Sequence, residues 1–241
     1  MFNNLNDNVA VEDNRLGGGF QLKETDVYTG KIKMAYGDTF DSGAMFIQLN
    51  VELDDGSEYR ERLIVTNKEG KNFYIDKKTG VERGLPGFTI ANDICLVTLG
   101  IPLSEVSGEE KTVKVYDYEA QAEVPQTKYV LMDLIDKEIK ISIRKIKKNK
   151  QAKNDSTGKY ENINEAQEIN EIHTVFDVES NFTTTELRNQ VEEPEFHDKW
   201  LEKYKGVEID NFKEVKGGSS KPFGAAKAGA TAKTGNPFKK S

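Results

Sequence analysis

Cysteine and histidine are scarce in this chain of 241 residues. Cys95 is the single cysteine, so no disulfide can form within the chain, and a reducing compartment fits this composition. His173 and His197 are the only histidines, which is too few for a zinc site of the usual Cys and His type. We interpret Cys95 as a small buried apolar residue and expect neither a metal nor a cofactor.

Long apolar runs are missing as well. No segment has the roughly 20 apolar residues that are needed to cross a bilayer. Residues 1–15 are rich in Asn and Asp and lack the basic-then-apolar order of a signal peptide. We therefore expect the chain to stay in the compartment where it is made and to have no membrane partner.

Motifs of catalysis are also absent. Gly17-Gly18-Gly19 is not followed by the Lys-Ser/Thr of a phosphate loop, and no Gly-x-Ser-x-Gly elbow occurs. A magnesium-dependent nuclease acting on replication intermediates stays open as an alternative, because such an enzyme needs only carboxylates and metal. Its candidate ligands would be Asp38, Asp41, Asp54, Asp55, Asp117 and Glu119. Solvated charge in predicted turns is the ordinary explanation of the acidic pairs, so we expect no enzyme activity.

The charge that is present is segregated along the chain. The net charge is −7, but residues 215–241 hold six lysines and no acid. This tail carries +6, which leaves −13 for the remainder. Within that remainder, residues 139–153 hold seven basic residues and no acid. Because segments of a protein act separately on a polyanion, the negative total does not exclude nucleic-acid binding.

Period-2 alternation predicts strands from Thr25 onward. In Ala44–Leu53, Ile47, Leu49 and Val51 point to one side, while Phe46, Gln48 and Asn50 point to the other. Asp55-Gly56 is a hairpin turn signal that leads into a further strand at 58–66. In residues 27–36 the same alternation places Ile32, Met34 and Tyr36 on one face. These three strands predict a β-meander.

The middle of the chain predicts a hairpin or long loop, a helix and two more strands. The turn-rich residues 67–87 form the loop, and residues 88–100 a short buried helix that ends at Gly100. Strands are predicted at 112–118 and 137–146, with a short helix or turn at 129–137 between them. Meander, helix and two strands is the order of a five-stranded OB-like Greek-key barrel, although other Greek-key barrels have similar periodicity. The predicted fold class is mainly β with appended helices (α+β).

The C-terminal third predicts helices and a tail. A polar connector at 147–160 precedes amphipathic helices at 162–177 and 183–204, the second of which begins with the capping signal Thr183-Thr-Thr-Glu186. The domain prediction is a flexible N-terminal arm at 1–20, an OB-fold DNA-binding core at 21–153, a helical region packing on the core at 154–206, and a disordered basic tail at 207–241.

Basic residues interleaved with aromatic rings predict a single-stranded DNA surface, because cations follow phosphates and rings stack on bases. Phe46 lies on the polar face of its strand, where either base stacking or cover from a second layer, such as the C-terminal helices, would explain it. For any single tyrosine, core packing is the better explanation, and a binding groove explains the set. In the predicted OB domain, the residues that we expect to contact DNA are Lys31, Lys33, Phe46, Arg60, Arg62, Lys71, Phe73, Tyr74, Lys77, Lys78, Arg83, Tyr116 and Tyr118.

A second basic group lies at residues 144–150, where like charges repel each other in a short span and a phosphate backbone would relieve the repulsion. The alternative is a solvated strand end. The residues that we expect to contact DNA there are Arg144, Lys145, Lys147 and Lys148.

Several local motifs resemble the single-stranded DNA-binding proteins of tailed bacteriophages, of the group found in short-tailed phages. They are Gly-Leu-Pro-Gly-Phe (84–88), Val-Lys-Val-Tyr-Asp-Tyr-Glu-Ala (113–120), Glu-Val-Pro (123–125), Val-Leu-Met-Asp-Leu-Ile-Asp-Lys-Glu-Ile (130–139), Asn-Glu-Ile-His-Thr-Val-Phe (170–176) and the helix at 196–204. The resemblance covers residues 25–205. It implies an OB-fold protein that coats single strands without sequence specificity in phage DNA replication, recombination and repair, in the cytoplasm of the infected bacterium.

The tail departs from this family. Many members end in an acidic tail that competes with DNA and recruits partners, whereas the two Pro-Phe pairs here lie among lysines. The tail would bind DNA, dock on an acidic surface of phage replication or recombination proteins or a host polymerase, or only solubilise the chain. Its candidate partner-binding residues are Phe223, Phe238, Lys239 and Lys240. A monomer and a homodimer both fit, and a non-DNA-binding interaction or scaffold protein is the remaining alternative.

Overall fold

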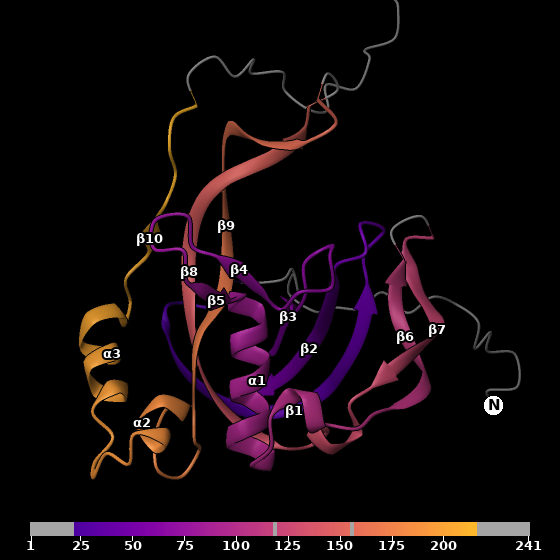
Figure 1. Ribbon diagram of the computed structural model, residues 1–241. Coiled ribbons are helices and arrows are strands. Elements are labelled where there is room, and N and C mark those ends of the chain that lie inside the picture. Colours follow the sequence, from indigo (N-terminus) through magenta and orange to yellow (C-terminus); the bar gives the residue numbers. More distant parts are fainter. Residues whose placement is uncertain (1–21, 118–119, 155–156, 216–241) are drawn as a thin grey trace, which may run out of the picture. The chain divides into compact units, whose positions relative to one another are not determined.

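The computed structural model describes residues 22–117, 120–154 and 157–215 (Figure 1). These residues form two compact units. The first contains residues 22–147 and 168–210, and the second contains residues 148–167 and 211–215. This division differs from the predicted core at 21–153, since most of the predicted helical region belongs to the first unit. The predicted arm at 1–20 and the tail from residue 216 onward lie outside the described residues.

The described residues are mostly β-strands, with three α-helices, so the mainly-β class with appended helices is confirmed. The main sheet has the order β10-β8-β1-β2-β3, and β9 pairs with β8. These strands are β1 (Asp26–Thr39), β2 (Met45–Leu53), β3 (Glu58–Ile64), β8 (Glu138–Lys153), β9 (Tyr160–Phe176) and β10 (Ile209–Asp210). The same sheet includes two further strands, from residues 109–130, which are described below.

The predicted meander is present in β1, β2 and β3, which pair as antiparallel neighbours. The alternation in β2 sends Ile47, Leu49 and Val51 into the buried core. The turn between β2 and β3 has Gly56 at a φ of 78°, which a residue with a Cβ rarely adopts. The pattern and the turn residue are both local signals, which is why the sequence predicts this part correctly.

The faces of β1 differ from the prediction. Its register against β2 shifts between Ile32 and Met34, where one extra residue forms a bulge. Before the bulge Ile32 points into the core, and after it Ala35 does. Tyr36 therefore lies on the opposite face, and Ile32, Met34 and Tyr36 do not share one side as predicted.

Helix α1 (Pro86–Leu99) is the predicted buried helix, and it packs on β3. Proline at its first turn and Gly100 after its last turn, at a φ of 73°, mark its ends. A Cβ at Gly87 would lie 2.5 Å from the backbone nitrogen and oxygen of Ile64, so glycine permits this close approach. Cys95 is buried in this helix, as predicted, and burial raises the pKa of its thiol to about 12.

Two hairpins interrupt the order of the main strands. β4 (Phe73–Ile75) and β5 (Glu82–Gly84) form a small sheet of their own, which confirms the hairpin prediction for residues 67–87. β6 (Glu109–Asp117) and β7 (Ala122–Val130) form the second hairpin. β7 also pairs with β1 at Tyr36 and Gly37. The strand predicted at 112–118 therefore belongs to a hairpin, and the strand predicted at 137–146 is the first part of β8. Short 3-10 turns lie at Leu103–Glu105 (η1) and Met132–Leu134 (η2).

The helix predicted at 162–177 is wrong, because this segment is strand β9. The apolar residues Ile169, Ile172 and Val175 recur every three residues, which imitates a helical face. Pairing with β8 overrides this local pattern, and the connector predicted at 147–160 is largely the end of β8 and its turn.

The helix predicted at 183–204 is two helices, α2 (Thr184–Arg188) and α3 (Phe196–Tyr204), with a break between them. The capping box is present: the Thr183 hydroxyl accepts from the Glu186 backbone N–H, and the Glu186 carboxylate accepts from the Thr183 N–H. The same carboxylate also accepts from the backbone N–H of Phe196, 2.8 Å away, so it joins the starts of both helices.

The sheet is open within the described residues. β3 pairs only with β2, and β9 pairs only with β8. A side-chain hydrogen bond joins the two edges, in which the backbone N–H of Ile172 in β9 donates to the Glu61 carboxylate in β3 over 2.9 Å. No hydrogen-bonded ladder joins β3 to β9 in the described residues, so the sheet does not close into the predicted barrel. None of the helices in the described ranges is long and apolar enough to cross a membrane.

Buried aromatic side chains attach α3 to β9. The indole N–H of Trp200 donates to His173 Nδ1 over 2.8 Å, and the rings of Trp200 and Tyr204 lie 5.3 Å apart. Burial, followed by the charges of Arg144 and Lys203, lowers the pKa of His173 to about 4. His173 therefore stays neutral, and its Nδ1 accepts the hydrogen bond from the indole N–H.

Stability is expected to fall as the pH drops from about 6.5 toward 4, because the unfolded chain then binds a proton on His173 that the folded chain does not. Above about pH 6.5 the contribution of this residue is complete. Urea unfolding at pH 7 and pH 5 measures the effect in the wild type and in His173→Gln, which cannot ionise. A variant with the same pH dependence as the wild type would contradict the assignment.

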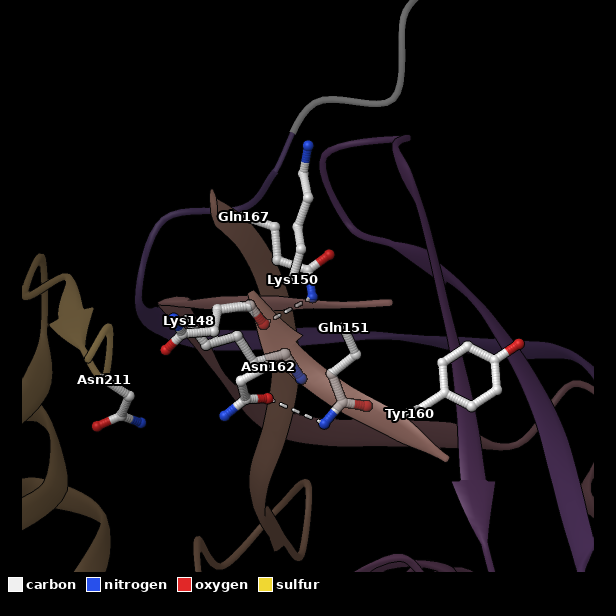
Figure 2. Close-up of a pocket in the computed structure, with 8 residues that line it drawn as sticks. Lys148, Lys150, Gln151, Tyr160, Asn162, Gln167 and Asn211 are labelled. Atoms are coloured by element: carbon white, nitrogen blue, oxygen red, sulfur yellow. Dashed lines mark hydrogen bonds between the residues drawn. The ribbon is translucent and has the colours of Figure 1, made fainter. Parts of the chain in front are cut away.

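The second unit consists of the outer part of the β8–β9 hairpin and residues 211–215 (Figure 2). Asparagine side chains connect the two pieces. The Asn149 amide donates to the backbone oxygen of Lys213 and accepts from its N–H, over 2.8 and 2.9 Å. Asn164 makes the same two bonds with Val215, over 2.9 and 2.6 Å. The predicted tail boundary at 207 is therefore too early, since residues 209–215 are held by these contacts and by β10.

Candidate nucleic-acid interface

The outer face of β2 and β3 carries polar and cationic side chains in cross-strand pairs. Phe46 lies opposite Ile64, Gln48 opposite Arg62, and Asn50 opposite Arg60. The other face of the same strands holds the core. The predicted positions of Arg60 and Arg62 on one side of β3, with Tyr59 on the other, are confirmed.

Arg62 lies at the centre of this face. Its guanidinium carbon is 5.3 Å from the centroid of the Phe46 ring, and its Nε donates to Gln48 Oε1 over 3.3 Å. Gln48 in turn donates to Asn50 over 3.0 Å. A guanidinium beside a ring can still donate its remaining N–H groups to a phosphate or a base.

Phe46 is not the exposed stacking ring that the sequence predicts. Only 6 % of it is exposed, because Phe40, from the loop after β1, packs on one side at 4.4 Å and Arg62 lies on the other. The alternative prediction, a covered ring, agrees with this exposure, and Phe40 provides cover. The buried Phe46 ring therefore supports Arg62 through its contact with the guanidinium.

Arg60 is held beside Arg62 by an ion pair with Glu58 at 2.7 Å. The hydrogen bond to Glu58, together with the charges of Glu58 and of Glu123 in β7, raises the pKa of Arg60. Since Glu123 acts on Arg60, the β6–β7 hairpin borders this face. Arg60 and Arg62 are both exposed.

The β6–β7 hairpin packs on the part of β1 that follows the bulge. Tyr36, Val113 and Val130 form a small apolar cluster there, so the Tyr36 ring is covered by the hairpin. Tyr36 still lies near both arginines, whose charges oppose the rise that burial causes in its pKa. The sequence did not indicate Tyr36 as part of this region, because the bulge that orients it is set by pairing. Tyr116 is 47 % exposed on the hairpin, and Tyr118 lies outside the described residues.

The β4–β5 hairpin holds a second group of predicted residues. Tyr74 is exposed and pairs in register with Arg83, which forms an ion pair with Asp76 at 3.0 Å. Phe73 is partly buried, and Lys77 and Lys78 are exposed at the turn. Lys71 pairs with Glu69 at 3.3 Å.

The lysines of β1 point to solvent within ion-pair distance of carboxylates. Lys31 lies 3.6 Å from Glu138, and Lys33 lies 3.7 Å from Glu52 and 3.8 Å from Asp136. Exposed pairs of this kind contribute little to stability and exchange readily with another anion.

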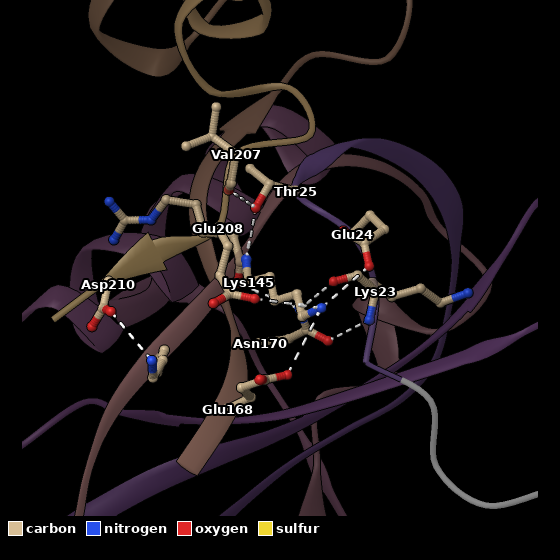
Figure 3. A network of polar contacts seen from close by, with 11 residues as sticks. Lys23, Glu24, Thr25, Lys145, Glu168, Asn170, Val207, Glu208 and Asp210 are labelled. Carbon is tan, nitrogen blue, oxygen red and sulfur yellow. Dashed lines mark hydrogen bonds and ion pairs between the residues drawn. The ribbon is translucent and has the colours of Figure 1, made fainter. Parts of the chain in front are cut away.

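The basic segment of β8 is largely neutralised within the protein (Figure 3). Lys145 lies 3.3 Å from Glu24, 3.6 Å from Glu208 and 3.8 Å from Glu168, and its pKa is raised, first by the hydrogen bond to Glu24. These carboxylates come from three separate segments, so the charge repulsion is relieved without a phosphate backbone.

Its neighbours are paired in the same way. Arg144 lies 3.2 Å from Glu171, and its side chain is mostly buried. Lys147 lies 3.4 Å from Asp210. Lys148 belongs to the second unit and has no carboxylate partner in the part of the chain that the structure describes. The sequence missed Glu168 and Glu171 as partners because it predicted a helix where β9 lies.

The carboxylates named for a nuclease are not brought together. No group of three or more His, Cys, Asp or Glu residues within the described ranges is placed to hold a metal ion. Asp38 pairs with Lys128, and hydrogen bonds from Ser57 and then Lys23 lower the pKa of Asp55 to about 2. Glu119 lies outside the described residues, as does the side chain of Asp117.

Comparison with known proteins adds no assignment. No protein-family model matches the chain, and no curated protein matches its sequence.

Proposed function

We propose that this chain binds single-stranded DNA through the outer face of β2 and β3 and that it does so without sequence specificity. The observation that carries the proposal is the pair Arg60 and Arg62, which are exposed side by side on that face while Phe46 supports one of them. Cations on a strand surface bind phosphates irrespective of base sequence.

The order of elements supports an OB-like core. A three-stranded meander, a helix and two further strands follow each other as β1, β2, β3, α1, β8 and β9, and the β4–β5 and β6–β7 hairpins are insertions. OB folds are five-stranded, partly open barrels that bind oligonucleotides on the face of their second and third strands. The arginine pair lies on the corresponding face, and the resemblance of the local motifs to phage single-stranded DNA-binding proteins agrees with this proposal.

The β6–β7 and β4–β5 hairpins extend the proposed surface. Tyr116 and Tyr74 are exposed rings on these hairpins, and stacking on an aromatic ring contributes about 1–3 kcal/mol per base. The basic segment at Arg144–Lys147 has a smaller part in this proposal than the sequence suggested, because its charges already have partners. A role in phage replication, recombination and repair follows only if the binding itself is present.

A salt titration of the full chain with dT oligomers tests the proposal. If about three or more phosphates are contacted, at roughly 0.7 ions released per contact, the affinity should fall at least about tenfold between 50 and 200 mM salt. Duplex DNA of the same length should bind more weakly. Equal affinity for duplex and single strand would refute the proposal. A chain that ends at Val215 serves as a second arm, because it removes the six-lysine tail and keeps the segment that Asn149 and Asn164 hold.

A further inference from the structure

Within the second unit, side-chain amides of the β8–β9 hairpin bind residues 211–215, where a strand ladder would use backbone groups. Asn149 and Asn164 each exchange two hydrogen bonds with the backbone of one residue, Lys213 and Val215 respectively. Residues two apart in an extended chain turn their N–H and C=O groups to the same side. The outer hairpin therefore already recognises one extended backbone through primary amides.

The first unit repeats the arrangement once. Asn170 accepts from the backbone N–H of Lys23 over 2.7 Å and donates to its oxygen over 2.8 Å. A primary amide has a donor and an acceptor at the spacing of a peptide group, so it substitutes for a neighbouring strand. This chain thus uses asparagine in three places to bind extended backbone.

A groove of about 590 Å³ lies on the second unit and is lined by further amides (Figure 2). Gln151 donates to Asn162 over 3.2 Å, and Gln167 donates to the backbone oxygen of Asn149 over 3.4 Å. Among the described residues nothing binds the side-chain oxygens of Gln151 and Gln167 or the amide nitrogens of Asn162 and Asn211. The groove therefore offers acceptors and donors together, as a peptide backbone requires.

The groove holds two lysines. Lys150 pairs with Glu165 at 3.1 Å, whereas Lys148 has no carboxylate partner among the described residues. Lys148 therefore offers its charge to one acidic side chain. A nucleic-acid strand presents a phosphate at every residue, and it would have to displace Glu165 to use Lys150 as well. Tyr160, 69 % exposed, adds a ring at the edge of the groove.

We propose that the groove of the second unit binds an extended peptide segment of a partner protein, with an acidic side chain of that segment on Lys148. The backbone of that segment forms hydrogen bonds with the side chains of Gln151, Asn162 and Gln167. Asn149 and Asn164 bind the backbone of residues 213 and 215 in the same way. This site is separate from the β2–β3 face, and the proposal does not depend on DNA binding.

A displayed library of random ten-residue peptides, selected on the full-length protein, tests the proposal. The control is the full-length triple variant Lys148→Ala, Gln151→Ala, Asn162→Ala, whose changes lie in the groove and leave Asn149 and Asn164 intact. Enriched peptides should contain an acidic residue and lack proline, because proline has no N–H to donate. By fluorescence anisotropy, the most enriched peptide should bind the variant at least tenfold more weakly than the wild type.

Three results would overturn the proposal. One is a selection that enriches no peptide on the wild type over the variant. Another is an enriched peptide whose affinity is unchanged when its acidic residue is replaced by alanine. The last is displacement of the peptide by dT10 from a protein carrying Arg60→Glu and Arg62→Glu, which would assign the groove to nucleic acid. Urea unfolding of the triple variant shows whether it is folded, and the single variant Lys148→Ala, which alters only the cation, repeats the test if it is not.

Discussion

Reversing both arginines of the β2–β3 face, Arg60→Glu with Arg62→Glu, is expected to lower the affinity for a dT oligomer by about 100-fold or more. Each arginine is exposed on the face that the proposal assigns to DNA. A charge-assisted hydrogen bond is worth about 1.5–3 kcal/mol, so the loss of two exceeds the roughly 2.7 kcal/mol that corresponds to 100-fold. The slope of log affinity against log salt should also become shallower, because two phosphate contacts are lost.

The matched control is Lys199→Glu with Lys205→Glu. Both lysines are well exposed on or just after α3, and the net charge changes by the same amount as in the arginine variant. Fluorescence anisotropy at 100 mM salt compares the two, with thermal unfolding of each as a check on folding. If the control loses as much affinity as the arginine variant, only net charge matters and the β2–β3 face is not the site.

The parts of the candidate site that the sequence predicts are those with local signals. The alternation in β2 and β3 places the arginines correctly, because every second residue must face the core. Gly100 likewise predicts where α1 ends, whereas the helix begins at Pro86, two residues before the predicted start. In each case the signal and the structural feature lie within a few residues of each other.

Features that depend on pairing could not be predicted in the same way. The bulge in β1 turns Tyr36 away from the core, and only the register against β2 reveals it. Phe46 looks like an exposed ring in the local pattern, but Phe40, from the loop between β1 and β2, packs on it. A one-residue shift in strand register decides the orientation of Tyr36, and one loop contact decides the burial of Phe46. Neither can be recognised from the local pattern of apolar and polar residues.

The ion pairs of the basic segment of β8 could not be predicted from the local sequence either. Lys145 meets carboxylates that are about 20 to 120 residues away along the chain, so a count within a short window finds only repulsion. Recognising β9 as a strand would have indicated the pairing, because Glu168 and Glu171 then run beside Arg144 and Lys145. Its apolar spacing of three favoured a helix, so the error in secondary structure became an error about the site.

Replacing Trp200 by alanine is expected to lower the free energy of unfolding by about 3–5 kcal/mol. The Trp200 side chain is 1 % exposed, its ring lies among those of His173 and Tyr204, and its N–H donates to His173. Truncation leaves a cavity the size of an indole and removes the indole hydrogen bond to His173. Urea unfolding followed by circular dichroism measures the loss.

Phe196→Ala on the same helix is the matched control. Phe196 is an aromatic residue at the start of α3 with a ring 6.3 Å from that of Phe176, but it is 40 % exposed. It should cost about 1 kcal/mol, because less apolar area leaves water when it folds. If Trp200→Ala costs no more than Phe196→Ala, the indole is not buried against His173. The contact between α3 and β9 would then be absent, whereas β9 itself would keep its pairing with β8.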